Sequence, residues 1–141
     1  NPVRFCPEPP AEAHKTVSLR LGQFQRYLNA AERLGALPLI YTGLSSGLRQ
    51  CELITLSWAD FHIRYKYILK GQRLLTLNDK TALLLERIPE TNSPHVFLNA
   101  KTRAPYKLHE FYYLHKKILK QARLPWVAFR DLQRQCMEVG I

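Results

Sequence analysis

Lysine and arginine side chains are the residues of this sequence whose type and number most clearly suggest a chemistry. They number 21 against 11 aspartates and glutamates, which gives the 141 residues a formal net charge of +10. A surface of that sign attracts polyanions, and its usual use is to neutralise phosphates with release of counterions. The charge by itself does not separate DNA, RNA and an anionic membrane as partners.

The composition narrows the class of protein. A hydrophobic content of 46% is ordinary for a globular domain, and 141 residues can bury one hydrophobic core. The longest apolar stretch, residues 34–44, is interrupted by Gly35, Pro38 and Gly43 and is too short to cross a bilayer. The three cysteines form no Cys-x-x-Cys pair, and the N-terminus lacks a secretory signal. We therefore expect a soluble, cytoplasmic protein without a metal site and without a membrane partner.

Two regions differ in their patterning. Residues 1–16 hold four of the nine prolines and no apolar periodicity, so they predict a linker or extended arm. Residues 17–141 predict one domain. Apolar side chains recur at helical spacing in about 24–34, 37–44, 49–57, 79–87, 107–122 and 130–139.

The period changes to two between Phe61 and Tyr67, which predicts a half-buried strand whose outer face carries Arg64 and Lys66. A tight turn over residues 70–72, a second strand over 73–77 and a short strand over 95–98 are expected to follow. The predicted fold class is α+β, mainly α, with a helical bundle and a small antiparallel sheet.

Residues 46–60 carry a specific motif. Its matched positions are Ser46-Gly47-Leu48-Arg49, Glu52-Leu53, Leu56, Trp58 and Asp60. In nine of fifteen places this segment resembles the first conserved box of the tyrosine recombinases of the phage-integrase type. Lys70-Gly71 is similar to the turn lysine of that family, and residues 129–134 are similar to its second box. The resemblance covers about residues 20–141 and implies an integrase-like catalytic domain, incomplete at its C-terminus.

The resemblance also implies a reaction. In the family, a tyrosine oxygen attacks a DNA phosphodiester, two arginines hold the phosphate, and a lysine and a histidine assist. No metal or other cofactor is required. Mapped onto this sequence, Arg49 is the first phosphate arginine and Lys70 the candidate general acid.

The second box departs from the family pattern. Arg130 stands where the family has histidine, and Gln133 stands where it has the second arginine. Glutamine cannot supply a charged, bidentate grip on phosphate. All seven tyrosines precede this box, so the usual nucleophile is also missing from these 141 residues. The sequence therefore predicts a DNA-binding domain acting in DNA integration and site-specific recombination, derived from a mobile genetic element and catalytically impaired as it stands.

The predicted partner is duplex DNA, bound with steep salt dependence and weak sequence specificity, with other recombinase subunits as a further expected partner. Three alternatives stay open: an active strand-exchange enzyme whose tyrosine lies on a longer natural chain, a remnant without function, and an RNA-binding or interaction module. The candidate DNA contacts are Arg49, Arg64, Lys66, Lys70, Arg73, Arg130 and Arg134.

Overall fold

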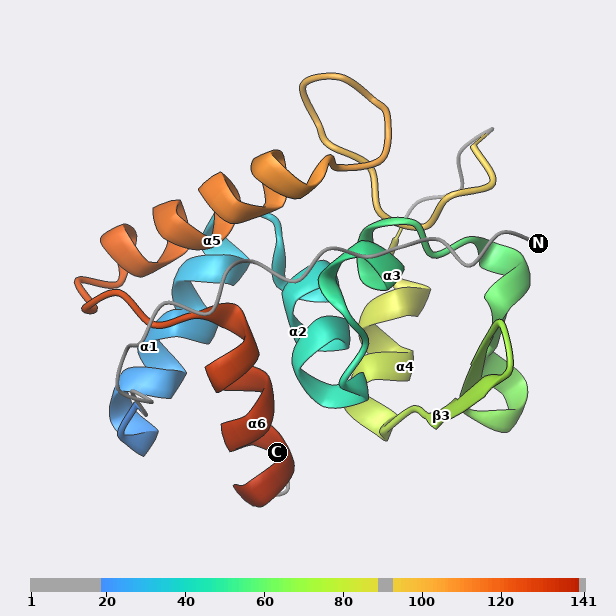
Figure 1. Ribbon diagram of the computed structural model, residues 1–141, viewed down its shortest axis with the longest axis horizontal. Helices are drawn as coiled ribbons and strands as arrows, with labels where there is room; N and C mark the ends of the chain where they lie inside the picture. Colours follow the sequence, from blue (N-terminus) through green and yellow to red (C-terminus); the bar gives the residue numbers. More distant parts are fainter. Residues whose placement is uncertain (1–18, 89–92, 140–141) are drawn as a thin grey trace.

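The computed structural model describes residues 19–88 and 93–139, so the predicted arm over residues 1–16 lies outside the described residues. The described chain is mainly helical with one small sheet, which confirms the predicted α+β class (Figure 1). Within it, no helix is both long and apolar enough to span a membrane. The helices are α1 (Leu21–Arg33), α2 (Leu37–Ser46), α3 (Gln50–Ile54), α4 (Asp79–Glu86), α5 (Leu108–Gln121) and α6 (Phe129–Val139).

Helix α2 lies at the centre of the fold, and α1, α3, α4 and α6 all pack against it (Figure 1). Its residues 37–44 are buried on every side except at Pro38. A helix that is apolar all round belongs inside a core rather than on its surface. The loop after α2, in which the matched motif of residues 46–60 begins, therefore leaves directly from the centre of the molecule.

Gly43 on α2 lies in close contact with Leu53 of α3 and Phe129 of α6. A Cβ atom at this position would lie 2.6 Å from Cδ2 of Leu53 and 3.0 Å from Cζ of Phe129. We expect Gly43→Ala to lower the free energy of unfolding by about 1–3 kcal/mol, the usual cost of overpacking a core. Urea denaturation measures it. Gly22→Ala on α1 is the matched control: its Cβ meets nothing within 4 Å, so that variant should gain about 0.5–1 kcal/mol. Equal stability of the two variants would contradict this packing.

The sheet has three antiparallel strands in the order β1 (Phe61–His62), β2 (Tyr67–Lys70) and β3 (Arg73–Thr76). The single strand predicted over residues 61–67 is wrong. A short 3-10 turn at Ile63–Tyr65, followed by Lys66 with φ of 56°, folds the chain back on itself. This reversal pairs Phe61 with Ile68, both of which are buried. The alternation does not predict burial here, because Tyr65 in the turn is 71% exposed.

Other boundaries follow local chemistry. The turn at Gly71, with φ of 60°, joins β2 to β3 as predicted. Asn78 caps α4 by accepting a hydrogen bond from the Thr81 N–H at 2.7 Å. Helix α3 is shorter than the predicted 49–57 and ends at Ile54. Residues 95–98 form only isolated bridges, Ser57 with His95 and Leu98 with Pro105, instead of the predicted strand.

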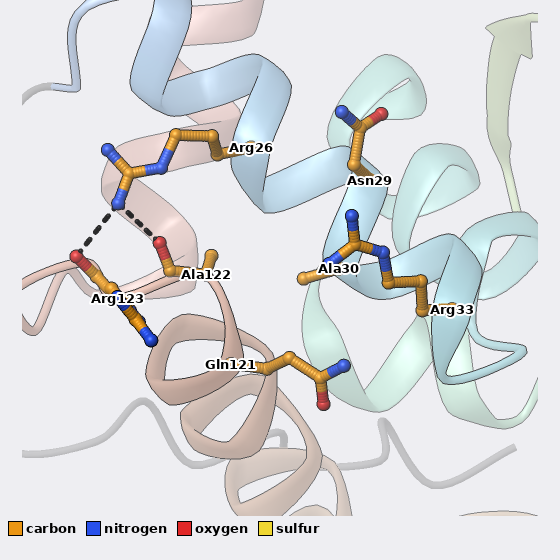
Figure 2. Close-up of a pocket in the computed structure, with 7 residues that line it drawn as sticks. All are labelled: Arg26, Asn29, Ala30, Arg33, Gln121, Ala122 and Arg123. Atoms are coloured by element: carbon orange, nitrogen blue, oxygen red, sulfur yellow. Dashed lines mark hydrogen bonds between the residues drawn. The ribbon is translucent and has the colours of Figure 1, made fainter.

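The C-terminal end of α5 closes in a left-handed turn at Arg123, which has φ of 57°. The Leu124 N–H donates to the Leu119 carbonyl at 2.9 Å, and the Arg123 N–H donates to the Lys120 carbonyl at 3.1 Å. Glycine is the usual residue at such a position. Helix α1 contacts this turn through Arg26, whose guanidinium donates to the carbonyls of Ala122 at 2.6 Å and Arg123 at 3.1 Å (Figure 2).

A buried polar chain joins α1, α5 and the segment before α6. His115 Nε2 lies 2.6 Å from the Val127 carbonyl, and its Nδ1 lies 2.7 Å from the Tyr27 hydroxyl. A carbonyl only accepts, so Nε2 carries the proton and Tyr27 donates to Nδ1. Burial lowers the pKa of His115 to about 4, against the partial opposing effect of the bond to Val127. Burial, with a smaller contribution from Cys136, raises the pKa of Tyr27.

Candidate functional site

Arg49 is placed on the surface by the two residues before it. Gly47 ends α2 in the left-handed conformation with φ of 72°, and Leu48 is completely buried. The chain is therefore anchored at Leu48, and Arg49 is exposed as the residue immediately before α3. Among the described residues, no hydrogen bond or ion pair holds its guanidinium. The fork of donors is available to an anion.

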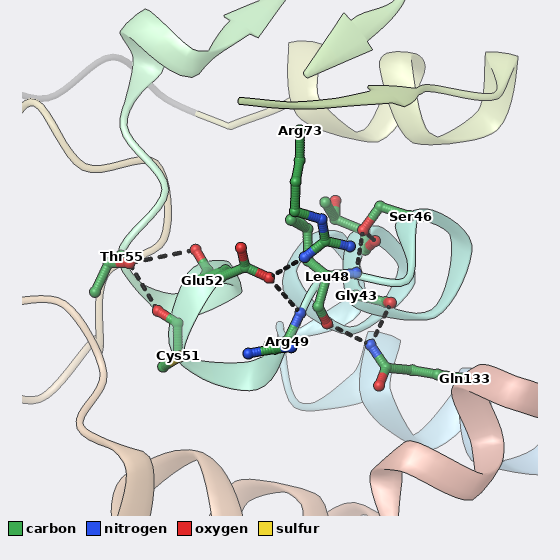
Figure 3. Close-up of polar contacts among 10 residues, drawn as sticks. Gly43, Ser46, Leu48, Arg49, Cys51, Glu52, Thr55, Arg73 and Gln133 are labelled. Atoms are coloured by element: carbon green, nitrogen blue, oxygen red, sulfur yellow. Dashed lines mark hydrogen bonds and ion pairs between the residues drawn. The ribbon is translucent and has the colours of Figure 1, made fainter. Parts of the chain in front are cut away.

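Glu52 ties the start of α3 to the hairpin. One of its carboxylate oxygens accepts the backbone N–H of Arg49 at 3.0 Å and also pairs with the Arg73 guanidinium (Figure 3). Arg73 lies on β3, so this contact brings the hairpin over the N-terminal end of α3. The sequence motif contained Glu52 but did not reveal Arg73 as its partner.

Lys70 lies at the other end of the same helix. Its Nζ is 3.5 Å from a carboxylate oxygen of Asp60 and 3.5 Å from the Thr55 carbonyl. Asp60 is itself fixed, because its carboxylate accepts the Ser57 N–H at 3.0 Å. Lys70 is opposite Arg73 in the strand register. The hairpin thus docks on α3 through two cations, one at each end of the helix.

Gln133 comes from α6 and is almost completely buried. Its amide nitrogen donates to the carbonyls of Gly43 at 2.8 Å and Leu48 at 2.7 Å (Figure 3). The second contact is to the residue immediately before Arg49. The structure therefore brings the second motif against the first across more than 80 residues of sequence. Both amide hydrogens are used on backbone carbonyls, which makes Gln133 a structural clamp here.

Arg130 and Arg134 are exposed on α6, on either side of Gln133 in the sequence. They are four residues apart, so they are neighbours on the helix surface. Two like charges at this spacing repel by a few tenths of a kcal/mol, a cost that an anion between them would offset.

Arg64 and Lys66 lie apart from this group. The Arg64 guanidinium lies over the ring of Tyr65, 5.9 Å from its centroid, and Lys66 pairs with Asp79 at the start of α4. No contact joins either residue to Arg49, Glu52 or Gln133 in the described part of the chain. The predicted basic outer face of a strand is thus replaced by two cations on the turn between β1 and β2.

The side chains around α3 can hold an anion, and nothing among them suggests a metal. In residues 19–88 and 93–139, no group of three or more His, Cys, Asp or Glu side chains could bind one. The arrangement consists of an exposed guanidinium at Arg49, a lysine and an arginine on the hairpin, and two arginines on α6. We name these five residues, Arg49, Lys70, Arg73, Arg130 and Arg134, the cationic group.

Comparison with solved structures shows what the fold is similar to. A crystal structure of XerA recombinase matches 84% of this chain and 48% of its own length, with a TM-score of 0.69 and 17% identity. The Tn1549 transposon integrase in complex with circular intermediate DNA matches 92% of this chain and 55% of its own length, with a TM-score of 0.73 and 16% identity. A variant of that integrase, also with a circular intermediate DNA, gives a TM-score of 0.70 and 16% identity.

This chain spans about half the length of those structures. No family model matches the sequence, and no curated protein matches it. At 16–17% identity the likeness concerns the fold. It confirms the integrase-like architecture, a helical bundle beside a small antiparallel sheet, that the residues of the first motif implied.

Proposed function

We propose that this chain, which has the fold of a tyrosine recombinase catalytic domain, binds duplex DNA through the cationic group and acts in recombination as a binding domain with impaired catalysis. The observation that carries the proposal is the convergence at α3. Lys70 and Arg73 of the β2–β3 hairpin contact the two ends of α3. Gln133 of α6, which lies between Arg130 and Arg134 in the sequence, bonds to the Leu48 carbonyl immediately before Arg49.

Electrostatics support a phosphate partner. The cationic group contains five cations; within it, Lys70 pairs with Asp60 and Arg73 pairs with Glu52. The formal net charge of +10 adds a long-range attraction for a polyanion. The solved integrase of similar fold is in complex with DNA, which favours DNA over another polyanion. Contacts of this kind position the protein on the backbone and read little sequence.

Salt dependence of DNA binding tests the proposal. If about four phosphates are neutralised, the logarithm of the association constant falls against the logarithm of salt with a slope near −3.6, so doubling the salt weakens binding about tenfold. Electrophoretic shift of a duplex at several salt concentrations measures this slope. Arg49→Gln should reduce the magnitude of this slope by about one, because one phosphate contact is lost. Arg87→Gln, which alters an exposed cation just after α4 and outside the group, should leave it unchanged. Absence of a shifted band at low salt would end the proposal.

Impaired catalysis is the finer part of the proposal. The buried Gln133 amide is neutral and is already bonded to two carbonyls, so it cannot grip a phosphate as the family's second arginine does. Loss of one such donor costs on the order of a hundredfold in rate. Arg130 stands where the family has histidine, and an arginine side chain is a poor proton carrier.

A nicked suicide DNA substrate tests this part separately from binding. The longest natural form of the chain, incubated alone and with added recombinase subunits, should yield no covalent protein–DNA adduct on a denaturing gel. An adduct would show instead that the missing groups come from a longer chain or a partner, and DNA binding would stand unaffected.

A further inference from the structure

A second basic site lies away from the cationic group, in the pocket between α1 and the C-terminal end of α5. The pocket has a volume of about 350 Å³, and its charged lining residues are Arg26, Arg33 and Arg123. Figure 1 draws this end of α5 at one edge of the molecule, with α3 beyond the opposite end of the helix. None of the residues that line this pocket belongs to the first motif or to the second.

Five of the seven residues that line the pocket carry side-chain hydrogen-bond donors. Three guanidinium groups are joined by the side-chain amides of Asn29 and Gln121, and no aspartate or glutamate lines the pocket. Asn29 uses its oxygen to accept from Gln25 at 3.1 Å, which leaves its NH₂ group as a donor. Figure 2 shows these side chains gathered from two helices around one space.

The three arginines are not equivalent. Arg26 is held by the carbonyls of Ala122 and Arg123, and it thereby offsets the negative end of α5, which would otherwise repel an anion. Arg33 and Arg123 have no ion pair or side-chain hydrogen bond with any residue in the described ranges. Arg26, Asn29 and Arg33 lie on one face of α1 because they follow helical spacing.

The backbone at Arg123 is in the left-handed conformation, as it is at Lys66 and Arg103. Its φ of 57° favours glycine, yet the chain carries an arginine there, and the side chain of that arginine lines the pocket.

We infer that this pocket binds a phosphate group, held by the guanidinium groups of Arg33 and Arg123 with the amides of Asn29 and Gln121. Guanidinium forks match the oxygens of phosphate and bind them through several charge-assisted hydrogen bonds at once. The phosphate comes either from a DNA backbone or from a free phosphate compound.

Titration with inorganic phosphate at constant ionic strength, followed by backbone amide NMR, tests the site without DNA. Saturable shifts are expected for the amides of Asn29, Arg33, Gln121 and Arg123. The double variant Arg33→Gln/Arg123→Gly should lose them, and it should fold because glycine suits φ of 57°. The control Arg20→Gln/Arg87→Gln, which removes the same charge elsewhere, should retain them. Shifts that do not saturate, or that persist in the Arg33/Arg123 variant, overturn the site.

Duplex DNA then distinguishes the two sources of phosphate. If the DNA backbone occupies the pocket, the Arg33/Arg123 variant binds DNA more weakly, and its salt slope falls by about two relative to the control variant. If a free phosphate compound occupies it, the variant binds DNA as the control does while the phosphate shifts are lost. The phosphate titration decides the site even if no form of the chain binds DNA.

Discussion

Replacing Gln133 by leucine is expected to lower the free energy of unfolding by about 2–3 kcal/mol, although the two side chains are similar in size. The amide of Gln133 bonds to the Gly43 and Leu48 carbonyls in a buried setting. Leucine leaves both carbonyls without this partner, and a buried acceptor that loses its bond costs about 1–3 kcal/mol. Urea denaturation of the variant and the wild type measures the difference.

The same substitution should also weaken DNA binding, even though it removes no charge. Leu48 precedes Arg49, so release of its carbonyl loosens the loop that presents the guanidinium. The control is Gln25→Leu, which alters an exposed amide on α1 and should change stability by less than about 0.5 kcal/mol. If Gln133→Leu unfolds at the same urea concentration as this control, Gln133 is not the clamp described above.

Acidification from pH 7 to pH 4 is expected to remove roughly 3 kcal/mol of stability through His115 alone. The pKa of this histidine is about 4 in the folded protein, against an ordinary value of 6.5 in the unfolded chain. Between these values the unfolded chain binds a proton that the folded protein does not. Stability is therefore complete above pH 6.5, falls as the pH drops, and levels off below pH 4.

The variant His115→Gln tests this attribution. It should be less stable than the wild type at pH 7, because the bonds to Tyr27 and Val127 are disturbed, but its stability should vary less between pH 6.5 and pH 4. His109→Gln, on an exposed position of the same helix, should retain the wild-type pH dependence. Thermal unfolding over this pH range makes the comparison. A His115→Gln curve parallel to that of the wild type would assign the acid sensitivity to other groups.

Local patterns in the sequence were sufficient for most elements. The helical periodicities predicted α1, α2, α4, α5 and α6 to within a few residues, because each of these helices buries one face or is buried entirely. Gly71 and Asn78 marked a turn and a cap because their roles depend on their own backbone and near neighbours. The motif around Arg49 also implied the integrase-like fold that comparison with solved structures confirms.

Tertiary structure decided how the elements meet. The alternation over residues 61–67 fits a strand and a hairpin equally, and only the pairing of Phe61 with Ile68 selects the hairpin. In the sequence, Gln133 stands where the family has an arginine. In the fold, its amide donates to the Leu48 carbonyl, 85 residues away, and holds the loop before α3. The Arg26 guanidinium donates to carbonyls that lie 96 and 97 residues away in the sequence. No sequence motif predicted the pocket beside it.

The physical reason is the range over which each signal acts. Periodicity and capping depend on residues within one or two helical turns of each other, so a short stretch of sequence is sufficient to predict them. Which face packs against which, and which buried amide finds which carbonyl, depends on the summed burial of the whole core. The sequence alone therefore determined the elements and the cationic character of this protein. The fold determined that Lys70 and Arg73 meet the two ends of α3 and that Arg26, Arg33 and Arg123 line one pocket.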